Sequence, residues 1–142
     1  MFISEIMTKD VITISPDASL KEIGLIFKEE RISGIPVIDS YGNIAGIVTL
    51  TDMLKILDRI YTWKELEKRL TRLDLGNMRQ EEKLKAKVRD VMTKDVFTVN
   101  VHETVDFVVR IMLTKNIHTF PVTEEGKLIG VVGKRDLIYA CF

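Results

Sequence analysis

The chain has 142 residues, of which 46% are hydrophobic and 30% charged, which suits one compact domain or two half-domains sharing a core. Its 21 basic residues balance its 21 acidic residues, which argues against a surface that binds nucleic acid or an anionic membrane throughout. The single cysteine, Cys141, excludes an intrachain disulfide. With neither a transmembrane-length apolar run nor a secretory signal in view, we expect a soluble cytoplasmic protein.

One pattern occurs twice, at residues 3–57 and 88–142. The run from Met7 to Val11 recurs from Met92 to Val96, and Gly46 and Asp52 recur as Gly130 and Asp136. A duplicated unit usually packs against its twin about a pseudo-twofold axis. We therefore expect repeats at 1–57 and 88–142 that share one core, joined by a helical connector at 58–87.

Each repeat begins with a predicted strand and a helix. The strands are the β-prone runs Val11–Ile14 and Val96–Val99. In the first repeat, Ser19 followed three residues later by Glu22 fits a capping box at the start of a helix. The following apolar residues have helical spacing and form a stripe in each repeat: Leu20, Ile23, Gly24 and Phe27, then Val105, Val108, Val109 and Met112.

Two further strands and a second helix complete each repeat. The strands span 35–38 and 44–48 in the first repeat and 120–122 and 128–132 in the second, with glycine in each turn at 42 and 126. The last helices start near Asp52 and Asp136. We expect their buried sides to comprise Met53, Leu54 and Leu57, and Leu137 and Ile138. The pattern predicts an α+β fold of two β-α-β-β-α repeats.

The connector carries its own helix signals. Thr62 to Glu65 is a second capping-box candidate, the run Leu75-Gly76-Asn77 indicates a helix end, and a short basic helix follows it. One interpretation is a solvated connector, and the other is a docking arm for a partner or a second protomer. Acidic residues interrupt the basic helix and no aromatic platform accompanies it, which disfavours nucleic-acid binding.

The segment from Gly46 to Asp52 is the strongest candidate for ligand chemistry. A buried strand ends in hydroxyl residues and a helix begins with a carboxylate. Free N–H groups at a helix start favour a phosphate, the hydroxyls of Thr49 and Thr51 add donors, and a carboxylate can accept from ribose hydroxyls. The plain alternative is that these residues are ordinary helix caps.

These motifs, in this order and twice, resemble the cystathionine β-synthase (CBS) domain family. The matching features are the Met-Thr-Lys-Asp-Val run, the Ile32 to Val37 stretch, and the Gly-Ile-Val-Thr-Leu-Thr-Asp motif ending at Asp52. Two copies resemble the tandem pair called a Bateman module. The resemblance implies that the two repeats pack sheet to sheet and that pairs of modules form a disc-like homodimer. It also implies two clefts that bind adenosine-containing ligands such as AMP, ADP, ATP or S-adenosylmethionine.

The resemblance also implies a role for each candidate site residue. Asp52 and Asp136 would bind ribose hydroxyls, while Thr49 and Thr51 would contact ribose or phosphate. The adenine would lie near Ile12 or Phe97. It would also contact the segments before the two prolines, which are Ile32, Ser33 and Gly34 in one repeat and Ile117, His118 and Thr119 in the other.

The second repeat departs from this pattern. Gly133 stands where the first repeat has Thr49, so one hydroxyl is missing, and we expect unequal clefts with the fuller ligand set at Asp52. Lys134 and Arg135 either favour longer phosphate chains or face solvent. His118 is either a phosphate contact or a structural residue.

No nucleophile–base pair, phosphate loop or metal-ligand spacing is visible, so the sequence indicates a binding module and neither an enzyme nor a metal site. We expect it to sense an adenosine ligand without a cofactor and to signal in trans to an effector protein that the sequence does not identify. The alternative is a structural dimerisation module with vestigial clefts.

Overall fold

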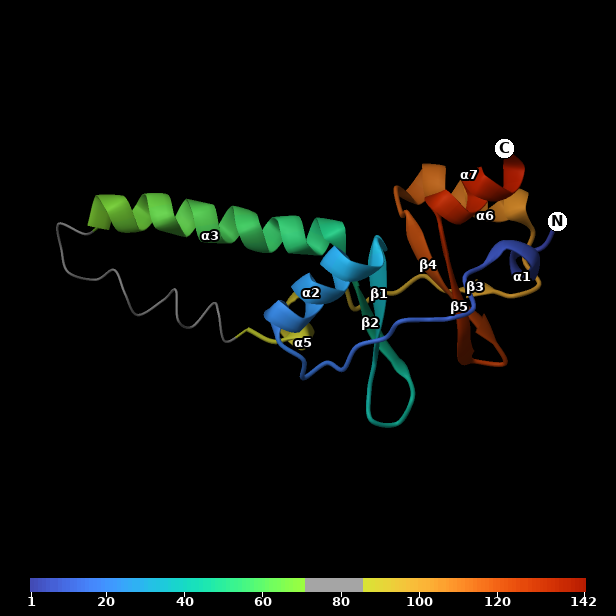
Figure 1. The fold of residues 1–142 in the computed structure, drawn as a ribbon, viewed down its shortest axis with the longest axis horizontal. Helices are drawn as coiled ribbons and strands as arrows, with labels where there is room; N and C mark the ends of the chain where they lie inside the picture. Colours follow the sequence, from blue (N-terminus) through green and yellow to red (C-terminus); the bar gives the residue numbers. More distant parts are fainter. Residues whose placement is uncertain (71–85) are drawn as a thin grey trace.

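The protein has the predicted α+β fold, with two small sheets and helices packed on them (Figure 1). The computed structural model describes residues 1–70 and 86–142, with the side chains of 60 and 63–70 left out of the description. The first repeat contains α1 (Ile3–Ile6), α2 (Leu20–Glu30), β1 (Gly34–Ile38), β2 (Ile44–Thr49) and α3 (Leu50–Leu70). The second contains α5 (Val88–Val91), β3 (Val99–Asn100), α6 (Val105–Lys115), β4 (Thr119–Glu124), β5 (Lys127–Gly133) and α7 (Lys134–Cys141).

The helix α2 follows from its sequence signals. The Ser19 hydroxyl accepts a hydrogen bond from the Glu22 N–H at 3.1 Å, which satisfies one free donor of the first turn. The stripe predicted for this helix faces the first repeat's core, where Ile23 is fully buried. The equivalent helix α6 buries Val108 and Met112, whereas Val109 from the same predicted stripe is 38% exposed.

The two predicted hairpins are confirmed. β1 pairs antiparallel with β2, β4 pairs antiparallel with β5, and the turn glycines Gly42 and Gly126 have φ of 83° and 78°. The predicted first strands were too long. In the first repeat, Ile14 makes a single parallel bridge to Val37. In the second repeat the strand is the two-residue β3, which pairs with β4. Both segments are short because each contacts its sheet only beside the second half of β1 or β4.

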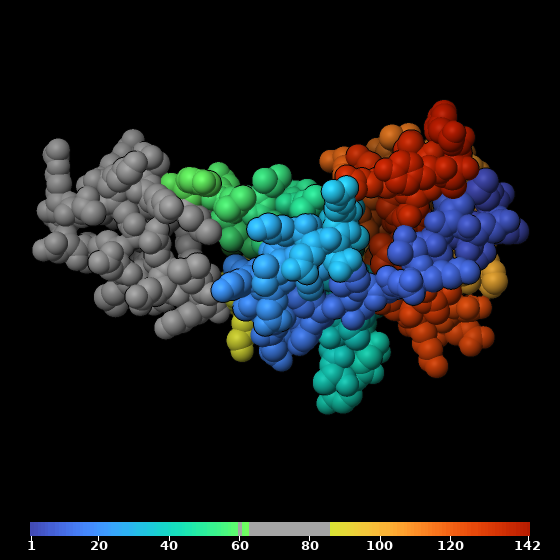
Figure 2. Space-filling view, in the orientation of Figure 1, coloured from blue at the N-terminus to red at the C-terminus, as the bar shows by residue number. Residues whose placement is uncertain are grey.

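The N-terminal segments of the two repeats are exchanged. Residues 1–8, here called strap 1, pair with the second repeat, and the Thr8 N–H donates to the Val131 carbonyl at 2.8 Å. Residues 86–93, here called strap 2, pair with the first repeat, and the Thr93 N–H donates to the Ile47 carbonyl at 2.8 Å. Figure 2 shows strap 1 in dark blue lying against the orange and red atoms of the second repeat.

The buried residues that the structure describes form two core clusters, so the expectation of one shared core was wrong. Ile3 of strap 1 is fully buried in the second repeat's cluster, which includes Phe120 and Val122. Val88 of strap 2 is fully buried in the first repeat's cluster, which includes Ile23 and Val37. Each repeat therefore completes its core with a residue from its twin. The ranges 1–57, 58–87 and 88–142 stay a prediction as domain boundaries.

The helix α3 differs from the prediction in two ways. It runs unbroken from Leu50 to Leu70, so the separate helix predicted to start at Thr62 is wrong, and no glycine or proline interrupts this stretch. Leu54 and Leu57 are 63% and 47% exposed and Ile138 of α7 is 54% exposed, so their predicted burial is wrong. The prediction is confirmed for Met53 and Leu137, which contact the first and the second core.

The second connector helix predicted after Asn77 lies outside the described residues. Within the residues that are described, every helix is too short or too polar to cross a membrane.

Candidate functional site

The carboxylate of Asp52 closes the first turn of α3. Its Oδ2 accepts from the Thr49 N–H at 2.8 Å and from the Thr49 hydroxyl at 3.1 Å, and that hydroxyl accepts from the Asp52 N–H at 3.2 Å. The chain adopts this reciprocal cap because β2 turns directly into α3, which leaves the first N–H groups of the helix without helical partners. Asp52 is 6% exposed.

A second contact reaches Asp52 from the other repeat. The hydroxyl of Thr93 in strap 2 donates to Oδ1 at 3.0 Å, with Oδ2 at 3.3 Å. The carboxylate therefore lies where the two repeats meet, and it already accepts hydrogen bonds from hydroxyl groups there.

The second repeat builds the same arrangement with fewer donors. Asp136 Oδ2 accepts from the Gly133 N–H at 2.7 Å, and Oδ1 accepts from the Thr8 hydroxyl of strap 1 at 3.0 Å. Because Gly133 replaces Thr49, no hydroxyl from the preceding strand reaches this carboxylate. The two helix starts are thus equivalent in geometry and unequal in hydrogen bonding.

The segments before the two prolines meet between the repeats. The hydroxyls of Ser33 and Thr119 lie 2.7 Å apart, and a Cβ added to Gly34 would come within 3.0 Å of Thr119. The Leu50 N–H donates to the Ser33 carbonyl at 3.1 Å, and the Lys134 N–H donates to the His118 carbonyl at 3.2 Å. Each predicted segment is therefore tied to the helix start that follows it.

The other predicted residues are dispersed around these groups. Ile12 is half-buried, Ile32 packs on the first core, Ile117 packs on the second, and Thr51 is exposed. Phe97 packs edge-on against Phe120 with centroids 5.7 Å apart, and Lys115 Nζ lies 5.1 Å from its centroid. This packing ties the Phe97 ring to the second core.

Three polar groups of the second repeat lie near this junction. His118 Nδ1 is buried without a hydrogen-bond partner. The Arg135 guanidinium donates to the Arg31 carbonyl at 3.2 Å, while Lys134 is exposed. The structure thus gives Arg135 a contact with the first repeat, beyond the two options that the sequence left open.

A pocket of about 250 Å³ lies beside Asp52, between α3 and strap 2. Sequence reasoning missed the neighbours of the carboxylate there. Thr93 and Lys55 line the pocket together with Ile56, Arg59, Asp90, Val91 and Met92. The repeated Met-Thr-Lys-Asp-Val run contained the signal for Thr8 and Thr93, but their placement depends on the strap exchange.

Comparison with known proteins identifies the architecture. The family model for the CBS domain matches residues 3–59 and 88–142. The uncharacterized protein MJ1426 of Methanocaldococcus jannaschii is 33% identical, with 99% of this chain and 90% of that protein covered. An inosine-5′-monophosphate dehydrogenase from the same organism is 30% identical over 94% of this chain, which spans 22% of that longer enzyme.

Solved structures share the fold over nearly the whole chain. The CBS domain pair of protein MJ0100, in complex with 5′-methylthioadenosine and S-adenosyl-L-methionine, superposes with a TM-score of 0.77 at 24% identity, covering 99% of this chain and 94% of that one. CBSX2 in complex with AMP superposes with a TM-score of 0.74 at 22% identity, covering 98% and 94%. At these identities the likeness concerns the fold.

Proposed function

The chain belongs to the CBS domain family as a tandem pair of such domains, and we propose that it senses an adenosine-containing ligand in the cytoplasm and regulates a separate partner. The observation that carries this proposal is the placement of Asp52. Its carboxylate is buried at a helix start between the repeats and accepts bonds from hydroxyl groups. A ribose diol offers the same donors.

The ligands of the two similar structures support the choice of ligand class. AMP, 5′-methylthioadenosine and S-adenosylmethionine all contain adenosine. We propose that Asp52 and Asp136 each bind ribose, with Thr49 and Thr51 beside the first site. The adenine would lie against the half-buried apolar residues Ile12, Ile32 and Ile117 next to Ser33, Gly34 and Thr119. Lys134, Arg135 and His118, whose Nδ1 has no hydrogen-bond partner, would face a phosphate group of the ligand.

Regulation without catalysis is part of the same proposal. The two CBS domains account for most of this chain, and the site groups described above are acceptors and hydroxyls rather than a nucleophile with a base. A ligand between the repeats changes the output by binding one arrangement more tightly than another, and its differential affinity limits the size of the effect.

Thermal unfolding with carboxamide variants tests the site. A ligand at 100 times its Kd stabilises the folded protein by about 2.7 kcal/mol. We expect AMP to raise the Tm of the wild type most, that of Asp136→Asn less, and that of Asp52→Asn least. Asparagine keeps an oxygen that can cap the helix but removes the charge that binds a diol. Asp58→Asn, on an exposed position of α3, is the matched control. Equal shifts in all four proteins would reject the site.

A structural dimer is the second candidate, and exposed apolar residues favour it. α3 carries a row at helical spacing, formed by Leu50, Leu54, Leu57 and Tyr61, each at least 47% exposed. α7 adds Ile138 and Tyr139, which are 54% and 78% exposed. Large exposed apolar patches mark interaction surfaces, and we propose that a second copy covers these two helices.

Sedimentation velocity tests this second candidate. Leu54→Glu places a charge in the row and should give a monomer where the wild type gives a dimer. Leu113→Glu, a position on α6 that is 81% exposed, is the matched control and should leave the dimer intact. A wild type that is monomeric at every concentration would contradict this candidate.

A further inference from the structure

Thr8 and Thr93 occupy equivalent places in the two straps and make equivalent bonds. Each donates its hydroxyl proton to Oδ1 of an aspartate in the other repeat, at 3.0 Å in both cases. These contacts join residues 128 and 41 positions apart in the chain. Both copies of the repeat have this contact, and in both copies it joins one repeat to the other. The two threonines therefore have the same role at the two carboxylates.

The hydrogen-bond pattern of Asp52 shows what Thr93 does there. Oδ2 is engaged by the N–H and hydroxyl of Thr49, whereas the described residues supply Oδ1 only with the hydroxyl of Thr93. A diol that binds a carboxylate through both hydroxyls needs both oxygens. Oδ1 can accept a second hydrogen bond, but Thr93 Oγ1 lies within reach of both oxygens of Asp52, at 3.0 and 3.3 Å, and so occupies the side on which a diol would bridge them. Thr8 lies in the same way beside Oδ1 of Asp136.

Each threonine is fixed to a strap that packs tightly on a strand. The Ile47 N–H donates to the Thr93 carbonyl at 2.9 Å, and a Cβ at Gly46 would lie 2.8 Å from Met92 Sδ. The other strap repeats this packing, since a Cβ at Gly130 would lie 2.6 Å from Met7 Sδ. A threonine hydroxyl can leave its carboxylate by rotation of the side chain or by movement of the strap that carries it.

We propose that Thr8 and Thr93 set ligand affinity by competing with ligand hydroxyls for Asp136 and Asp52, so that ligand binding loosens the strap that carries the threonine. This inference rests on the proposed function. It adds two affinity-determining residues and a route from each site to the opposite repeat. Exchange of one hydroxyl donor for another is nearly balanced in energy, which makes such competition reversible. By linkage, whatever loosens a strap tightens the corresponding site.

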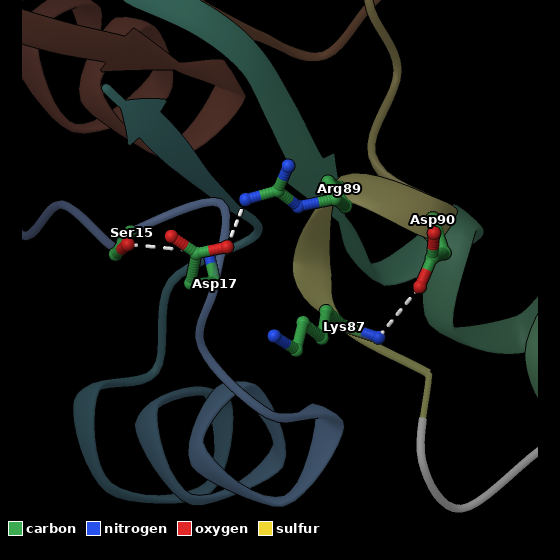
Figure 3. A network of polar contacts seen from close by, with 5 residues as sticks. All are labelled: Ser15, Asp17, Lys87, Arg89 and Asp90. Carbon is green, nitrogen blue, oxygen red and sulfur yellow. Dashed lines mark hydrogen bonds and ion pairs between the residues drawn. The ribbon is translucent and has the colours of Figure 1, made fainter. Parts of the chain in front are cut away.

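The two straps differ in how firmly they are held. Arg89 of strap 2 forms an ion pair with Asp17 of the first repeat, while Ser15 caps the Asp17 N–H (Figure 3). At the equivalent place strap 1 has Ser4, whose described contact is its N–H donating to the Val101 carbonyl at 3.2 Å. We therefore expect ligand at Asp136 to release strap 1 more readily than ligand at Asp52 releases strap 2.

Isosteric variants test the competition. Thr93→Val and Thr8→Val remove the hydroxyl and keep the branched shape. Calorimetry with AMP on ligand-stripped protein should show tighter binding, by about three- to tenfold at the site concerned, the equivalent of one hydrogen bond. Thr93→Ser should return the wild-type affinity. Thr98→Val, at an exposed position, should leave the affinity unchanged.

Amide hydrogen exchange supplies the second measurement. The Ile47 and Val131 amides donate to Thr93 and Thr8, so they report on strap 2 and strap 1 separately. Saturating AMP should speed exchange at one or both of these amides, more at Val131 when both sites are filled. Weaker or unchanged AMP binding in both valine variants, or slower exchange with AMP, would overturn the competition while leaving the proposed function standing. No binding of AMP, ADP, ATP or S-adenosylmethionine by any of these proteins would overturn both.

Discussion

At the scale of single residues, helix capping and the proposed ribose contact, which the sequence left as alternatives, are compatible at Asp52. It is the ordinary cap of α3 through Thr49, and its other oxygen faces a hydroxyl from the opposite repeat. A helix start exposes unpaired N–H groups, so a carboxylate placed there is both a structural cap and a charged acceptor. The same reasoning applies to Asp136, which has one hydroxyl donor fewer.

Substitution of Gly46 most directly tests how closely strap 2 packs on β2. A Cβ there would lie 2.7 Å from the Thr93 carbonyl oxygen and 2.8 Å from Met92 Sδ. Gly46→Ala should therefore destabilise the protein by about 1–3 kcal/mol in urea unfolding. Gly24→Ala is the matched control, because nothing lies within 4 Å of its added Cβ and alanine favours the helix by about 1 kcal/mol. A Gly46→Ala variant with an unchanged free energy of unfolding would contradict the close packing of strap 2 on β2.

Asp106 provides a pH prediction. The hydrogen bond from the Thr104 side chain is the main cause that lowers the pKa of the Asp106 carboxyl below its usual value of 3.8. A lowered folded-state pKa contributes stability that is present above 3.8 and is lost as the pH falls through the folded value. Carboxyl NMR titration should show this lowered pKa in the wild type and a rise towards 3.8 in Thr104→Val. An unchanged pKa in the variant would remove Thr104 as the cause.

At the scale of helices and strands, local signals predicted the fold well and long-range exchange escaped them. The repeated pattern located both hairpins and both apolar helix stripes, because these depend on neighbouring residues. The burial of Leu54, Leu57 and Ile138 was mispredicted, since one face of α3 and α7 is apolar without packing on either core. Nothing in the local sequence shows that strap 1 packs on the second repeat. It is this packing that places Thr8 beside Asp136.

The strap exchange predicts a stability effect far along the chain from the mutated residue. Ile3 is fully buried in the second repeat's core, so Ile3→Ala should cost about 2–5 kcal/mol in urea unfolding, and the amides of β4 and β5 should lose protection. Phe2→Ala is the control, since Phe2 is 52% exposed and its truncation should cost less. Loss of protection confined to the first repeat would contradict the exchange.

At the scale of the whole molecule, the exchange makes each repeat part of its twin's candidate site. In the proposed binding mode, a ligand between the repeats would contact an aspartate from one repeat and a threonine from the strap of the other, so its binding would affect both repeats at once. The exposed rows on α3 and α7 offer a surface through which such a change can reach a second copy or another partner. These features fit a sensor whose output is a change of shape.

Calorimetry on protein stripped of carried-over ligand by unfolding and refolding tests the central claim most directly. The titrants are AMP, ADP, ATP and S-adenosylmethionine, each with the wild type and Asp52→Asn. We predict saturable binding of at least one titrant by the wild type and marked weakening in the variant. The absence of heat with all four titrants, from a refolded protein that unfolds cooperatively, would contradict the account and leave the structural dimer as the function to pursue.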